Sequence, residues 1–350
     1  MDPRFCGMAT PANVSCRPQC PGGADTSAPG PSTTYFVVES VAGLLAIAGN
    51  AFICAAILRD RKLRAVVTYH FLASLAAADA LVGAVAIPCA QLSAAGLPQG
   101  QPRLCLLMLC TLLGLTQASV FGLLGVAVER YVAILQPLQY PAVLSPRNAR
   151  WGIAASWSLA MALGLLPLLG WHKPLLPDGR CLFNAIIEDT YMVYFNFLVC
   201  MLLPLVVMLG LYARIFLAAR RHIRQVAVRG VPGGGRGRVL RRELHVAASL
   251  FLVLCCFALC WLPLHVLNTM TLFCPSCPLP GHLVLAAIAL SHANSALNPV
   301  LYVLRLRAFR QAFEAALACS WAPPGRALSM GLVPSSGQGL GSRNDLLPGK

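Results

Sequence analysis

The chain has 350 residues, of which 57% are hydrophobic and only 11% are charged. Soluble domains carry about 25% charged residues, so this composition excludes an ordinary soluble protein and indicates one embedded in a membrane. The net charge of +15 lies mostly in short segments between apolar runs, such as 59–64 and the eight arginines of 220–242. That placement predicts cytoplasmic loops of a membrane protein and argues against nucleic-acid binding.

Residues 1–33 are rich in Pro, Gly, Ser and Thr and are predicted to form a flexible extracellular tail. Asn13 opens the sequon Asn-Val-Ser, which is expected to carry a glycan because this end is predicted to face outside. The tail lacks the apolar core of a cleavable signal peptide, so the first span is expected to act as an uncleaved targeting signal. The sequence leaves the pairing of Cys6, Cys16 and Cys20 open.

Seven apolar runs follow, at 35–58, 69–93, 104–135, 151–171, 191–218, 245–273 and 281–304. Each reaches the roughly 20 residues that a membrane-spanning helix needs. With the basic loops inside, an odd number of crossings puts the amino terminus outside and the carboxyl terminus inside. We therefore predict an all-α integral membrane protein with a seven-transmembrane helix bundle at 34–304.

Basic and apolar residues alternate at helical spacing over 305–318, which predicts a short amphipathic eighth helix on the inner membrane surface. Residues 319–350 return to Pro, Gly and Ser and are predicted to be a disordered cytoplasmic tail. Cys319 is either a palmitoylation site or an unmodified surface cysteine, and the sequence does not decide between them.

Two acidic residues, Glu39 and Asp79, lie well inside predicted spans. A carboxylate buried in a membrane must be paired, protonated or bound to a cation. Asp79 is therefore either a structural hydrogen-bond hub or a group that ionises or binds a cation. We favour the second interpretation, because amide side chains could serve structure at lower cost. Its expected neighbours are polar residues of the third and seventh spans: Ser119, Asn294, Ser295 and Asn298.

Glu129-Arg130-Tyr131 closes the third span at its cytoplasmic end, and Glu243 lies at the inner end of the sixth. The simple interpretation is that Arg130 only extends its charged group to the membrane surface. An Arg130–Glu243 pair would instead hold two helices together until activation separates them, which is a switch in physical terms.

Trp261, His265 and Asn268 recur at i, i+4 and i+7, so a helix puts all three on one face. In the seventh span Ser291 and His292 lie on a similar polar face. A single buried histidine is usually a hydrogen-bonded core residue. Two of them near the outer ends of adjacent spans favour a ligand pocket inside the bundle.

The sequence contains no H-E-x-x-H, no Walker loop, no nucleophile elbow and no paired catalytic carboxylates, so we predict that the protein is not an enzyme. Cys274 and Cys277 have metal-like spacing but no second pair nearby, which favours a small disulfide loop over a zinc site. Cys105 and Cys181 are also predicted to face outside, where disulfides form.

Several of these residues recur in order from the first span to the last, and together the chain resembles the rhodopsin-like G-protein-coupled receptors. The matching residues are Asn50, Asp79, Pro88, Glu129-Arg130-Tyr131, Trp157, Pro204, Tyr212, Cys260-Trp261-Leu262-Pro263 and Asn298-Pro299-Val300-Leu301-Tyr302. Within that family residues 35–318 are similar to adenosine receptors of the stimulatory subtypes. The most specific stretches are 115–119, 191–197, 214–221, 257–268 and 291–295.

The resemblance implies a pocket for the nucleoside. Phe183 would stack on adenine, and Asn268 would hydrogen-bond its amine and a ring nitrogen, because an amide both donates and accepts. Ser291 and His292 would bind the ribose. The remaining implied pocket residues are Thr116 beside the ribose, Glu39 orienting His292, His265 and Trp261 on the inner side, and the apolar walls Leu113, Met192, Leu264 and Ile288.

The same resemblance implies a sodium site, two disulfides and a G-protein switch, with no other cofactor. Sodium would favour the resting state. The implied disulfides are Cys105–Cys181 and Cys274–Cys277. The implied sodium site comprises Asp79, Ser119, Trp261, Asn294 and Asn298, and the switch comprises Glu129, Arg130, Tyr131, Tyr212, Glu243 and Tyr302.

One position departs from the family. Asn184 follows Cys181-Leu182-Phe183, where the family has a glutamate that accepts a hydrogen bond from the adenine amine. An amide oxygen accepts without charge assistance, which weakens the expected agonist binding by ~1–2 kcal/mol.

These expectations describe a plasma-membrane receptor for extracellular adenosine that couples to a heterotrimeric G protein, Gs, and raises cyclic AMP. Its partners would be a purine nucleoside, the G protein and membrane lipid, without nucleic acid. An adenosine-receptor-like protein with altered purine selectivity or constitutive activity is the first alternative, motivated by Asn184. A seven-span transporter or channel is the second, but the internal repeats and continuous polar path that it predicts are not seen in the sequence.

Overall fold

A computed structural model describes residues 33–174, 176–228, 235–277 and 279–321 of the chain. Asn13, Cys6, Cys16 and Cys20 lie outside these residues, as does the tail from 322 onwards. The described residues form helices and connecting loops, and their only β-type pairing is an isolated bridge between His172 and Ile187. The predicted all-α fold is confirmed.

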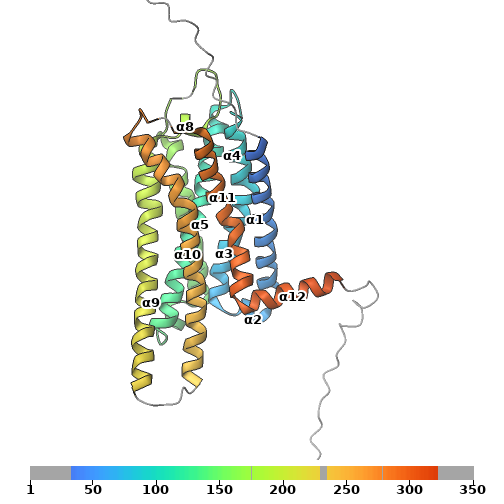
Figure 1. Ribbon diagram of the computed structural model, residues 1–350, viewed down its shortest axis with the longest axis vertical. Helices are drawn as coiled ribbons and strands as arrows, with labels where there is room; N and C mark the ends of the chain where they lie inside the picture. The colour runs from blue at the N-terminus through green and yellow to red at the C-terminus, as the bar shows by residue number, and fades with distance from the viewer. Residues whose placement is uncertain (1–32, 175, 229–234, 278, 322–350) are drawn as a thin grey trace, which may run out of the picture.

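Long helices lie side by side, and the last helix, α12, leaves the bundle at a steep angle (Figure 1). The first half of the bundle contains three spans and two short loop helices. These are α1 (Thr33–Arg59), α2 (Arg61–Arg64), α3 (Val67–Leu81) with the π-helix η1 (Val82–Ala86) and α4 (Ile87–Ala94), α5 (Pro102–Leu135), and α6 (Tyr140–Val143).

The second half contains four spans, one loop helix and the surface helix. These are α7 (Pro146–Gly164) with the 3₁₀ turn η2 (Leu166–Leu169), α8 (Phe183–Ile186), the π-helix η3 (Tyr191–Leu202) continuing into α9 (Leu203–Val228), α10 (Gly235–Phe273), α11 (Gly281–Arg305) and α12 (Arg307–Trp321).

Six helices in the described part of the chain are long and apolar enough to cross a membrane. The remaining predicted span, the fourth along the chain at 151–171, corresponds to the less apolar α7. α7 begins earlier than predicted because Ser145 caps it, accepting from the backbone N–H of Asn148 at 3.3 Å. It also ends earlier, because Pro167 lacks an N–H and Gly170 has a φ of 119°.

Large apolar side chains cover the outside of the bundle. Leu44, Val206 and Leu259 are exposed to 66%, 56% and 70%. Contiguous apolar surface of this extent is unstable in water, whereas lipid tails solvate it well. The protein is therefore a multi-pass membrane protein.

Two glycines bring α5 and α7 into close contact. A Cβ atom on Gly164 would lie 2.4 Å from the backbone nitrogen of Gly114. The neighbouring Met161 covers Gly114 in turn, with its sulfur 2.7 Å from a Cβ built there. Small residues at helix crossings allow such backbone approach in membranes, and this crossing fixes α7 against the centre of the bundle.

The junction between α11 and α12 lies at Leu306, whose backbone is extended, so Arg305 belongs to α11. Arg310 closes the end of α11, since its guanidinium donates to the carbonyl oxygens of Val303 and Leu304. Phe309 is fully buried and packs between Tyr69 and Tyr302. α12 extends to Trp321, slightly beyond the predicted end at 318.

Candidate functional site

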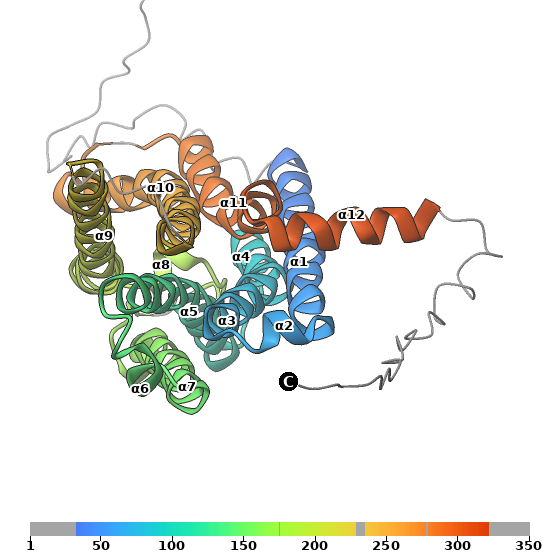
Figure 2. The ribbon, with the colours of Figure 1, turned by 90° about the horizontal axis from the view of Figure 1, so that it is seen from below.

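The outer loop between α7 and η3 is tied to α5 by a disulfide between Cys105 and Cys181. The second disulfide joins Cys274 and Cys277 after α10, so the predicted disulfide loop is confirmed. Phe183, two residues after Cys181, begins α8, which lies inside the ring of long helices (Figure 2). Its half-buried ring packs against apolar residues of α5 and η3 and of η1 and α4.

Asn184, the residue that departs from the family pattern, is exposed. Its backbone carbonyl accepts a hydrogen bond from Lys173 Nζ at 2.9 Å. The same ammonium group pairs with Asp189 Oδ2 at 2.7 Å. Lys173 therefore ties α8 to the segment that follows it, while the Asn184 side chain makes no hydrogen bond to any described residue.

The four predicted apolar wall residues lie on four different spans. Leu113 and Met192 are buried in one apolar cluster of α5 and η3. Leu264 on α10 and Ile288 on α11 are half-buried, as is Asn268 one turn beyond Leu264.

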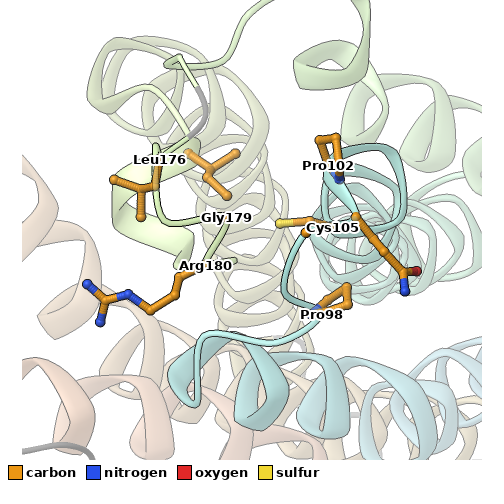
Figure 3. A pocket seen from close by; sticks show the side chains of 9 residues that line it. Pro98, Pro102, Cys105, Leu176, Gly179 and Arg180 are labelled. Carbon is orange, nitrogen blue, oxygen red and sulfur yellow. The ribbon is translucent and has the colours of Figure 1, made fainter.

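Two cavities lie away from these wall residues. One, of about 120 Å³, lies beside the outer disulfide, between Leu176, Gly179 and Arg180 on one side and Pro98, Pro102 and Cys105 on the other (Figure 3). The other is on the outside of α7.

The predicted ribose side contains buried polar groups. His292 Nδ1 lies 2.8 Å from Glu39 Oε2, and both side chains are almost fully buried. The carboxylate accepts, so Nδ1 carries the proton and Nε2 stays free to contact another group. The hydroxyls of Ser291 and Thr116 donate to backbone carbonyls three residues earlier, at 2.7 and 2.9 Å, and keep their acceptor capacity.

An aromatic stack lies below the wall residues. The His265 ring is stacked on Phe197 with centroids 4.7 Å apart, and on Trp261 with centroids 5.9 Å apart. His265 Nδ1 and Trp261 Nε1 are buried and have no hydrogen-bond partner among the described residues. The stack joins η3 to α10, and Phe197 is a member that sequence reasoning missed, although it lies in one of the family-specific stretches.

Asp79 is fully buried and accepts three side-chain hydrogen bonds from two other spans. Ser119 and Ser295 donate to Oδ1 at 2.7 and 2.9 Å, and Asn298 donates to Oδ2 at 2.7 Å. Asn294, the fourth expected neighbour, is buried but makes no such bond in the described part of the chain.

The surroundings of Asp79 contain amide oxygens without partners. Asn50 donates to the carbonyls of Ala46 and Ser295, both at 2.9 Å, which ties α1 to α11. The side-chain oxygens of Asn50, Asn294 and Asn298 are buried and accept no hydrogen bond from any described residue. Buried oxygens in proteins rarely lack a hydrogen-bond partner, which points to water or a cation beside them.

The opposite end of the bundle holds Arg130 in a network of hydrogen bonds. Its guanidinium donates twice to Glu129, at 2.6 Å each, and once to Glu243 of α10 at 2.8 Å. It also donates to the Thr68 hydroxyl. Glu129 in turn accepts from Thr68 at 2.9 Å and from Tyr140 of α6 at 2.8 Å. Thr68 and Tyr140 carry no local sequence signal and were not among the predicted residues.

Three tyrosines complete the predicted switch set. Tyr212 is buried against Phe216 and Phe251, which links α9 to α10. Tyr302 is buried with its hydroxyl unpaired among the described residues. Tyr131 is partly buried against the main core and does not join the Arg130 network.

The sequence of the chain also matches a known protein family. The profile of the family described as 7 transmembrane receptor (rhodopsin family) matches residues 49–302. The chain belongs to this family. Its members are receptors and not enzymes, and α7 is the fourth of their seven spans.

Adenosine receptors are among the relatives of the chain. The chain is 44% identical to adenosine receptor A2a of Homo sapiens over 297 residues, which cover 81% of this chain and 72% of the relative. It is 41% identical to adenosine receptor A2b of Gallus gallus over 303 residues, which cover 81% of this chain and 87% of the relative. Within the rhodopsin family, the receptor therefore belongs with the adenosine receptors.

Proposed function

We propose that this receptor lies in the plasma membrane, binds extracellular adenosine and activates a stimulatory G protein, which raises cyclic AMP. The names of its relatives support the ligand class. The basic segments 59–64 and 220–242 support an inside location for the loops that follow the first and fifth spans, with the amino terminus outside. The stretch 214–221, which matches the stimulatory subtypes, supports the choice of G protein.

The buried Glu39–His292 pair is the observation that carries the ligand assignment. A carboxylate inside a membrane span is costly, and this one accepts a hydrogen bond from an imidazole on another helix. The pair holds the ring in one orientation, with Nε2 available for a ligand hydroxyl. Ser291, the adjacent residue, offers a second polar contact, so this side of the bundle suits a ribose.

Adenine recognition would fall to Phe183 and Asn268. The Phe183 ring, at the start of α8, offers an aromatic face of the kind that stacks on a base. Asn268 carries both a donor and an acceptor, which match the amine and a neighbouring ring nitrogen of adenine. Leu113, Met192, Leu264 and Ile288 would enclose the ligand.

Signal transfer would pass from the ligand to the aromatic stack and then to Arg130. Movement of His265 and Trp261 would displace α10 about Pro263, which lies inside that helix. Since Glu243 is on the same helix, its displacement would break the contact with Arg130 and open the inner end to the G protein.

A sodium ion would stabilise the resting receptor. The carboxylate of Asp79 and the unpaired amide oxygens of Asn294 and Asn298 fit a hard cation, which prefers oxygen ligands. Ser119 and Trp261 complete the proposed site. The bound ion would supply charge neutralisation for Asp79 and would oppose closure of the space around it.

The test is cyclic AMP in cells that lack other adenosine receptors and express the full chain, with and without adenosine. We expect a rise that Asn268→Ala abolishes, at surface expression equal to wild type. The control Gln311→Ala removes an exposed amide on α12 that makes no hydrogen bond in the described structure, and should respond like the wild type. An unchanged response in Asn268→Ala would disprove the pocket.

Altered purine selectivity is the second candidate, and the exposed Asn184 favours it. Without a carboxylate at this position, the preference for the adenine amine is weakened. Comparing adenosine with inosine and guanosine in the same cells separates the two candidates. Adenosine selectivity is the expected result, and equal potency of inosine would establish the alternative.

A further inference from the structure

The lipid-facing side of α7 contains a groove that the receptor mechanism does not use. Arg147, Arg150, Trp151 and Ala154 line it, and its volume is about 410 Å³. These residues recur at i, i+3, i+4 and i+7, so they form one continuous face of the helix.

The two arginines of the groove have no anionic partner. Both are exposed, and among the described residues no carboxylate lies within ion-pair distance of either guanidinium. Elsewhere in the described structure, the half-buried Lys173 and the exposed Arg180 each pair with an aspartate. Two adjacent guanidinium groups without a partner match a phosphate, because each presents parallel N–H donors to two oxygens.

The position of Trp151 identifies the source of the phosphate as a lipid. Its indole is 64% exposed, on a helix at the periphery of the bundle (Figure 2). Tryptophan at such a position marks the boundary between headgroups and acyl chains. The face continues away from the arginines through the exposed Ala154, Ser158 and Ala162, whose small side chains leave room for an acyl chain.

We propose that this groove binds the headgroup of one anionic phospholipid. Arg147 and Arg150 hold the phosphate and the added negative charge, and Trp151 packs against the glycerol region. The groove lies at the same end of the bundle as Arg130, so the proposed orientation makes it an inner-leaflet site, where anionic lipids are enriched. The assignment of the leaflet rests on the proposed function, whereas the lipid contact does not.

Lipid retention tests the site independently of signalling. The full-length receptor is extracted from vesicles of phosphatidylcholine and phosphatidylserine, and bound phosphatidylserine is measured by native mass spectrometry. Relative to wild type, Arg147→Gln with Arg150→Gln should lower retention roughly 30-fold, at about 5-fold per cation. The charge-preserving pair Arg147→Lys with Arg150→Lys should restore only part of it, because lysine keeps the charge but lacks the parallel N–H donors.

The matched control removes two other exposed arginines at the same end, Arg61→Gln with Arg64→Gln, and should retain lipid like the wild type. Thermal unfolding in phosphatidylcholine alone establishes that each variant is folded. Equal losses in both double glutamine variants would mean diffuse attraction and overturn the site. Full displacement by glycerophosphoserine, which has no acyl chains, would overturn the lipid assignment.

Discussion

Removing one carboxylate at the inner end of α10 should raise basal signalling. Glu243→Gln leaves Arg130 with its two bonds to Glu129 and its bond to Thr68, but removes its charged contact with α10. The resting state should lose stability relative to the active state, in which this contact is absent. An isosteric glutamine keeps the size of the side chain, so the effect comes from charge.

The size of the free-energy change follows from how exposed Arg130 and Glu243 are. Arg130 is 6% exposed and Glu243 is 36% exposed, so the pair is neither a surface contact nor fully buried. Exposed pairs contribute up to about 1 kcal/mol, and breaking a fully buried pair costs about 3–5 kcal/mol. Because Glu129 still compensates the guanidinium, we expect about 1 kcal/mol, which is roughly a fivefold rise in the ratio of active to resting receptor.

The assay is basal cyclic AMP, with adenosine deaminase present to remove endogenous adenosine and with values normalised to surface receptor. Glu314→Gln is the matched control, since it neutralises an exposed carboxylate on α12 without breaking an ion pair in the described structure. Tyr140→Phe removes a bond to Glu129 but leaves the contact between helices, so it should change basal signalling little. A basal level in Glu243→Gln equal to wild type, or an equal rise in Glu314→Gln, would refute the reasoning.

Three further predictions concern packing, sodium and the ligand. Gly164→Ala forces a methyl group against the backbone of Gly114, so thermal unfolding in detergent should show a loss of about 1–3 kcal/mol, and stability equal to wild type would contradict the close crossing. Asp79→Asn should abolish the effect of sodium on agonist binding, and a sodium effect of normal size in that variant would place the ion elsewhere. Asn184→Glu should tighten adenosine binding by about 5- to 30-fold in a radioligand assay, whereas unchanged affinity would mean that the exposed side chain never meets the ligand.

Hydropathy was sufficient to predict the spans, because a membrane helix needs a continuous apolar run whatever its neighbours are. The exception was the fourth span, whose ends depend on local capping by Ser145 and on Pro167 and Gly170. The π-helices η1 and η3 were not predicted. Their wider hydrogen-bond pattern depends on packing against other helices, and no residue preference encodes it.

The polar residues inside the spans could be predicted as important, because burying each of them carries a desolvation cost. Not all of their hydrogen-bond partners could be predicted. Asp79 and Arg130 stand out in any apolar run. Thr68 and Tyr140 do not, since a threonine and a tyrosine near a membrane surface are unremarkable in isolation. Only the folded chain brings them to Glu129. Likewise, periodicity cannot show that Asn184 is exposed, because the course of this loop depends on the disulfide and on Lys173.

The π-helical segment η3 has a consequence for how related receptors can diverge. Its wide turns hold more residues per turn than an α-helix, so losing one residue there can be absorbed by tighter hydrogen bonds. Such a deletion would rotate Met192 around the helix axis while Tyr212, farther along the same span, kept its neighbours. A single codon lost in this segment would thus change the lining of the ligand pocket without disturbing the G-protein end.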